Sequence, residues 1–279
     1  MATAPMPPGP DRDRGSRKHL LDLVCSPNFG SSLNQLLTGS GATIAAAPFP
    51  QPAGRRNKAD WQEYYVEQYL TSRPIPGWSQ SMPSAWWVNG GGTRPTWDLL
   101  CHVEVNAQPG ILLVEAKAHQ GELHWPGKRL DPSASVLSNQ SHAQIARCIV
   151  EANSALSRSC GGVFNLSACS HYQLANRMAY AWKLANLGLP VVLMYLGFIG
   201  DTYFKGDYIR DDWHWQRVMG GYLQGVIPQQ FPEQAHPVGG SGSVRFLVRS
   251  YSVQSVSIAP PPRALTNHGI VGVQPDAPS

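Results

Sequence analysis

The feature of this sequence that most constrains its fold is a pair of neighbouring segments, each with the pattern of a β-strand. Residues 97–105 alternate between apolar and polar side chains, which is the two-residue period of a strand. The segment Asn106–Gly110 has the composition of a turn, and residues 111–118 form a second strand. The two segments predict a β-hairpin.

The second strand carries an apolar run, Ile111–Val114, that ends in the triplet Glu115-Ala116-Lys117. Because side chains alternate along a strand, Glu115 and Lys117 share one face of it. The triplet therefore fixes a carboxylate and an ammonium side by side at the end of a strand.

A second carboxylate, Asp98, belongs to the preceding strand. If the turn is centred on Gln108, paired residue numbers sum to about 216, which sets Asp98 opposite roughly position 118. Glu115 and Lys117 then lie within diagonal reach of Asp98 across the hairpin. We expect these three residues to converge at one end of the two strands.

Such a group suits metal-assisted cleavage of a phosphodiester. Asp98 and Glu115 would hold Mg²⁺, with Mn²⁺ as a substitute, because hard cations prefer oxygen ligands. The bound ion would polarise the phosphate and lower the pKa of a water, and Lys117 would orient that water or offset developing charge. The alternative for a triplet as short as Glu-Ala-Lys is the solvated edge of a strand.

The segments Pro95–Asp98 and Val114–His119 together resemble the PD-(D/E)xK nuclease superfamily. The resemblance implies an α/β fold of the restriction-endonuclease-like type, a mixed β-sheet flanked by helices in the core order α-β-β-β-α-β. It also implies that Asp98 and Glu115 are metal ligands and Lys117 the catalytic lysine of a DNA-cleaving enzyme. The proline stands three residues before Asp98 rather than next to it.

That superfamily also contains members without activity, so a fold of this type does not settle function. The alternative function is a catalytically silent protein of the same fold that binds nucleic acid or regulates a partner. The intact set of Asp98, Glu115 and Lys117 favours the enzyme.

Two further glutamates are candidates for supporting the metal. A helix is expected from Asn57 or Asp60 to Leu70, and Glu63 and Glu67 share one face of it at a spacing of four. The resemblance implies an acidic residue on this helix, which we assign to Glu63 in preference to Glu67. Both glutamates are equally well explained as solvated side chains.

A second helix is expected from Ser170 or His171 to Gly188. Its core stripe comprises Leu174, Met178, Ala181 and Ala185, and an adjacent polar face comprises Gln173, Asn176, Arg177 and Tyr180. Gln173 resembles the glutamine of RecB-like nucleases, although Tyr180 follows it by seven residues rather than four, and Arg177 would suit a phosphate. The alternative is a polar face that only caps the sheet.

The remaining pattern sets the domain limits. Residues 1–55 are expected to be a largely disordered or irregular N-terminal segment, with short helical or irregular stretches at 19–24 and 33–37. Residues 56–258 are the expected nuclease-like domain, and 259–279 a disordered Pro-rich tail. Within the domain we expect strands at 85–88, 190–198 and 244–258 and a helix that begins at Ser141. The strand 190–198 is apolar throughout, which is typical of a central, parallel strand.

Composition excludes several classes. The net charge of +4 permits nucleic-acid binding without requiring it. Five scattered cysteines without a Cys-x-x-Cys pair argue against a zinc site or disulfide framework and for the cytoplasm. No apolar run approaches the length of a membrane span, and the first residues lack the apolar core of a signal peptide.

Three residues after the triplet are weaker candidates. His119 and His124 suit an acid, a base or a phosphate ligand, and Glu122 suits a second metal position. Polar side chains that rim the end of a strand are the more common explanation for all three.

Overall fold

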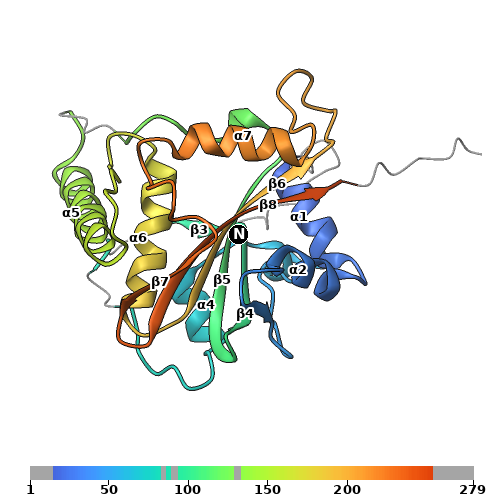
Figure 1. Cartoon of the computed structure of the whole chain (residues 1–279), viewed down its shortest axis with the longest axis horizontal. Coiled ribbons are helices and arrows are strands. Elements are labelled where there is room, and N and C mark those ends of the chain that lie inside the picture. Colours follow the sequence, from blue (N-terminus) through green and yellow to red (C-terminus); the bar gives the residue numbers. More distant parts are fainter. Residues whose placement is uncertain (1–14, 83–85, 89–93, 129–132, 254–279) are drawn as a thin grey trace, which may run out of the picture.

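A computed structural model describes residues 15–82, 86–88, 94–128 and 133–253, which form a mixed α/β structure around a curled six-stranded sheet (Figure 1). The sheet order is β1-β4-β5-β6-β8-β7, and β2 pairs with β3 separately. The helices are α1 (Ser16–Cys25), α2 (Phe29–Leu37), α3 (Lys58–Trp61), α4 (Val66–Ser72), α5 (Val136–Ser159), α6 (Tyr172–Asn186) and α7 (Asp212–Leu223), with a 3-10 turn at Gln120–Glu122. The strands are β1 (Ala42–Ile44), β2 (Tyr64–Tyr65), β3 (Thr96–Trp97), β4 (Leu99–Val105), β5 (Gln108–Lys117), β6 (Val191–Ile199), β7 (Ala235–Gly239) and β8 (Gly242–Ser252).

The expected hairpin is confirmed as β4 and β5, but its turn is earlier than predicted. Asn106 and Ala107 form the turn with φ of 49° and 63°, and Leu99 pairs with Val114. Two consecutive left-handed residues are typical of the tight turns that join twisted antiparallel strands. If this register continues by one residue beyond the pair of Leu99 and Val114, Asp98 lies opposite Glu115 rather than opposite position 118.

The glycine that suggested a later turn has another role. Gly110 lies within β5, and a Cβ atom there would stand 2.6 Å from the carbonyl oxygen of Pro190. Glycine is therefore needed where the start of β5 passes close to the residue before β6.

The apolar strand β6 is central and parallel, as predicted. It pairs in parallel with β5 on one side and with β8 on the other. The chain reaches β6 from β5 through α5 and α6, and a parallel pair requires a long connection of this kind. The expected last strand is β8, and residues 254–258 of that prediction lie outside the described residues.

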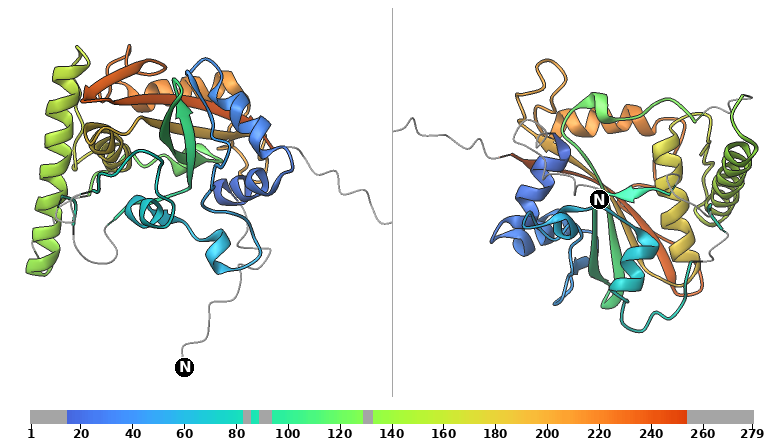
Figure 2. Two further views of the ribbon diagram at one scale, coloured as in Figure 1. Left: turned by 90° about the horizontal axis from the view of Figure 1, so that it is seen from below. Right: turned by 180° about the vertical axis from the view of Figure 1, so that it is seen from behind.

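Alternation along β5 divides the core into two layers. Ile111 and Leu113 belong to the cluster beneath α5, α6 and α7, whereas Leu112 and Val114 belong to the cluster beneath α1 and α2. Figure 1 shows these two groups of helices on opposite sides of the sheet, and both views of Figure 2 place α6 between α5 and the sheet. Glu115 and Lys117 continue the row that faces α6.

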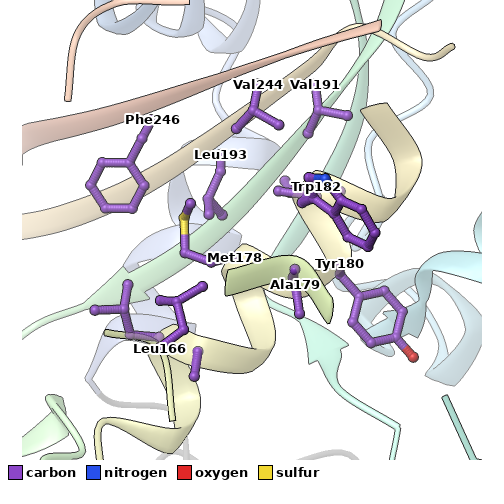
Figure 3. Packing of buried hydrophobic residues seen from close by; sticks show 14 of the residues in the cluster. Leu166, Met178, Ala179, Tyr180, Trp182, Val191, Leu193, Val244 and Phe246 are labelled. Carbon is purple, nitrogen blue, oxygen red and sulfur yellow. The ribbon is translucent and has the colours of Figure 1, made fainter. Parts of the chain in front are cut away.

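The helix α6 is buried on more sides than its polar face suggested. The predicted core stripe is confirmed, and Figure 3 shows Met178 beside Leu193 and Phe246 of the sheet. Every residue from 174 to 182 is buried, including Asn176 and Arg177. Asn176, Arg177 and Tyr180 of the polar face therefore lie largely against protein, whereas Gln173 is only partly buried.

Two predicted elements are wrong. The helix expected up to Leu70 is divided into α3 and α4 by β2, which pairs with β3 and sets Tyr64 opposite Trp97. Asn57 does cap the first piece, where its side chain accepts the backbone N–H of Asp60 at 3.1 Å. In the expected strand 85–88, Trp86, Trp87 and Val88 form no strand and pack into the core, and residue 85 lies outside the described residues.

Other boundaries also differ. Residues 16–44, which we assigned to the N-terminal segment outside the domain, hold α1, α2 and β1 and supply one layer of the core. The stretches 19–24 and 33–37, for which a helix was one of two expectations, lie within α1 and α2. The helix expected from Ser141 begins at Val136 and is capped by Ser135. Within the described residues, no helix combines the length and apolarity needed to cross a membrane.

Candidate active site

The three residues expected to converge lie together at one end of the hairpin. Asp98 occupies a bend between β3 and β4, and Glu115 and Lys117 are among the last three residues of β5. All three line one open cleft of about 630 Å³, which Gln173 and Arg177 of α6 also line. Residues distant in sequence thus meet on the face of the sheet covered by α6.

Glu115 is the centre of the polar network. It is buried, and its Oε1 atom accepts hydrogen bonds from Lys117 Nζ and, at 2.7 Å, from Gln173 Nε2. Its Oε2 atom accepts from Arg177 Nε at 2.6 Å. Burial would raise the pKa of Glu115, but the charges of Arg177 and Lys117 outweigh it and hold the pKa below its usual value. Glu115 is therefore ionised at neutral pH.

Asp98 has a different environment. Its Oδ2 atom accepts the backbone N–H of Ala116 at 2.7 Å. Burial, and then the charges of Glu115 and Glu63, raise the pKa of Asp98 well above its usual value despite the opposing charge of Lys117. Among the described residues, no lysine, arginine or histidine forms an ion pair with Asp98. Asp98 is thus a carboxyl group that lacks a cation.

The structure separates the two candidate supporting glutamates. Glu63 precedes β2 and accepts a hydrogen bond from Thr96 Oγ1 at 3.0 Å, and Thr96 lines the cleft. Glu67 lies in the first turn of α4, accepts from the hydroxyl of Tyr180 at 3.3 Å and lines a separate cavity. The expected shared helical face is absent because β2 intervenes, and only Glu63 is close enough to influence Asp98.

The helix α6 contributes two side chains rather than one. Gln173 Nε2 donates to Glu115, whereas the hydroxyl of Tyr180 donates to Glu67. Arg177 lies one helical turn beyond Gln173, with its guanidinium 4.5 Å from the ring centre of Trp97. Arg177 is therefore engaged by Glu115 and Trp97 and is not exposed as a phosphate ligand.

The weaker candidates have mixed positions. His119 stacks on Phe204 with ring centres 4.1 Å apart. Glu122 accepts from the backbone N–H of Ala118 and, at 3.0 Å, from Ser16 Oγ, so it closes the turn after β5. Glu122 and His124 both line the cleft.

Sequence reasoning missed three side chains that line the cleft, namely those of Ser16, Arg94 and Tyr172. Ser16 was missed because α1 was assigned to the irregular N-terminal segment. Tyr172 lies four residues before Asn176, which was placed on the polar face of the helix, and this spacing could have indicated it.

The donor atoms fit a hard divalent cation. Asp98 and Glu115 both supply carboxylate oxygens to the cleft. A bound cation would provide the positive partner that ionised Asp98 needs, since the pKa of Asp98 is raised by burial and by neighbouring carboxylates. No set of three or more His, Cys, Asp and Glu side chains is grouped for a metal in the part of the chain that the structure describes. A bound ion would therefore take its other ligands from water and substrate, which is usual for Mg²⁺.

Comparison with protein-family models, with curated proteins and with solved structures gives no match for this chain. The site itself is therefore the basis for assigning a function to this chain.

Proposed function

We propose that this chain is a metal-dependent nuclease that hydrolyses phosphodiester bonds of DNA. The observation that carries the proposal is the meeting of Asp98, Glu115 and Lys117 in one open cleft. Two carboxylates and a lysine so placed suit the binding of a hard cation beside a phosphate.

The order of elements also supports a restriction-endonuclease-like core. The strands β1, β4 and β5 are consecutive antiparallel neighbours, and α5 and α6 then lead to β6, which is parallel to β5 (Figure 1). With α2 before them, and with α3, β2, α4 and β3 inserted between β1 and β4, these elements correspond to the order α-β-β-β-α-β. The first strand in this assignment is β1 rather than the segment 85–88.

Each residue has a defined part in the proposed reaction. Asp98 and Glu115 would hold Mg²⁺ or Mn²⁺, which when bound supplies charge that polarises the phosphate and acidifies a water. Lys117 would donate a hydrogen bond to the attacking water or to a phosphate oxygen that gains charge. Gln173 and Arg177 fix the orientation of Glu115 through their hydrogen bonds.

A catalytically silent module that binds nucleic acid is the second candidate. It is favoured by the hydrogen bonding of Glu115, since both carboxylate oxygens are already engaged by Lys117, Gln173 and Arg177. Such a network also suits a purely structural role.

One experiment separates the two candidates. The purified chain is incubated with linear, circular and single-stranded DNA in Mn²⁺, beside Asp98→Asn and the surface control Asp22→Asn. We expect cleavage by the wild type and by the control, and none by Asp98→Asn. Absence of any cleavage, together with Mn²⁺ binding that does not depend on Asp98, would support the silent module.

A further inference from the structure

Arg177 is an unusual neighbour for a metal-binding carboxylate. Its Nε atom donates to Glu115 Oε2 at 2.6 Å, while Lys117 and Gln173 donate to the other oxygen. Oxygen ligands of a cation must offer lone pairs to it, and here each oxygen already accepts at least one hydrogen bond. A cation at Glu115 therefore shares this carboxylate with a fixed positive charge.

The position of Arg177 is firmly determined. The side chain is 7% exposed, and its guanidinium lies over the face of the fully buried Trp97. A planar guanidinium loses little entropy in such a setting, and the ring face attracts its charge. Arg177 cannot turn into solvent without breaking the contacts with Glu115 and Trp97 together.

The charges of the cleft are nearly balanced as a result. Asp98, Glu115 and Glu122 provide the three carboxylates that line it, and Arg94, Lys117 and Arg177 provide three cations. A fixed positive charge a few ångströms away repels an added divalent cation strongly, even at the effective dielectric constant near a protein surface. A substrate phosphate would add the negative charge that the cleft lacks.

We propose that Arg177 is a positioning residue that competes with the divalent cation for Glu115, so that the cation binds tightly only together with a substrate phosphate. This inference rests on the proposed function, because it assumes that Asp98 and Glu115 form the metal site. It assigns to Arg177 the task of keeping the site weakly loaded when no nucleic acid is present.

The test is a calorimetric Mn²⁺ titration of the full chain without nucleic acid. Arg177→Met keeps much of the side-chain volume and removes the charge, and we expect it to bind Mn²⁺ at least about tenfold more tightly than the wild type. Arg177→Lys keeps the charge and is expected to stay within about threefold of the wild type. Arg217→Met is the matched control, since Arg217 stacks on exposed Trp213 away from the cleft.

A second measurement needs no variant and therefore holds if Arg177→Met fails to fold. With a phosphorothioate-linked oligonucleotide present, the wild type should bind Mn²⁺ at least about tenfold more tightly than without it. Unchanged or weaker Mn²⁺ binding by folded Arg177→Met, or no gain with the oligonucleotide, overturns the inference. If Mn²⁺ binding by the wild type and by Arg177→Met is insensitive to Asp98→Asn, the proposed metal site itself fails.

Discussion

The substitution Gly127→Ala tests how the loop after β5 fixes the start of α6, the helix that carries Gln173. A Cβ atom at position 127 would stand 1.9 Å from the carbonyl carbon of Cys169 and 2.0 Å from its oxygen. Both atoms belong to the backbone, so no side-chain rotation relieves the overlap. The two segments must separate.

Separation breaks the hydrogen bonds that join them. Lys128 N–H donates to Ala168 at 2.8 Å, and His171 N–H donates to Trp125 at 2.8 Å. Loss of two such bonds costs about 2 kcal/mol, and the remaining overlap adds about 1 kcal/mol. We therefore expect Gly127→Ala to lower the free energy of unfolding by about 3 kcal/mol.

Urea denaturation followed by circular dichroism measures this loss. The matched control is Gly221→Ala in α7, where a Cβ atom meets nothing within 4 Å, and we expect it to be neutral or to stabilise by up to about 1 kcal/mol. A loss below about 1 kcal/mol for Gly127→Ala, with an unchanged denaturant slope, would refute the reasoning.

Two further predictions concern stability. In metal-free buffer, Asp98→Asn should stabilise the chain at neutral pH, because the raised pKa of Asp98 shows that its ionised form is unfavourable in the folded state. The gain in stability should fade as the pH drops below the ordinary pKa of an aspartate, because the carboxyl group is then protonated in both the folded and the unfolded state. Urea midpoints at several pH values measure this, and a gain that grows towards low pH would contradict it. Leu193→Ala in the fully buried centre of β6 should cost about 2–5 kcal/mol, whereas Leu137→Ala, at a side chain that is 74% exposed, should change stability by no more than about 0.5 kcal/mol. Equal losses in the two leucine variants would show that the burial assigned to β6 is wrong.

Local periodicity predicted the parts of the fold that depend on neighbours in sequence. Alternation along residues 97–105 and 111–118 was enough to place Glu115 and Lys117 on one face of a strand. The uniformly apolar run of residues 190–198 indicated a central strand. The register was missed because Gly110 is required by a contact with Pro190, about 80 residues away in sequence. No local pattern reveals such a contact.

Tertiary pairing explains the other differences. Tyr64 and Tyr65 leave the expected helix because they pair with Trp97 and Thr96, respectively, in a two-stranded sheet. The same pairing moves Glu67 away from the site and leaves Glu63 beside it. Arg177 appeared as a surface cation because its partner, Glu115, belongs to a different element.

We propose that Asp98, Glu115 and Lys117 form one site that cleaves phosphodiester bonds. The most direct test of this claim is the rate of Mg²⁺-dependent DNA cleavage by Lys117→Met, with the exposed Lys58→Met as the control. We predict a loss of at least about 100-fold for Lys117→Met, an unchanged rate for Lys58→Met, and the same circular dichroism spectrum for both. Cleavage by pure, folded Lys117→Met at the wild-type rate would contradict the claim.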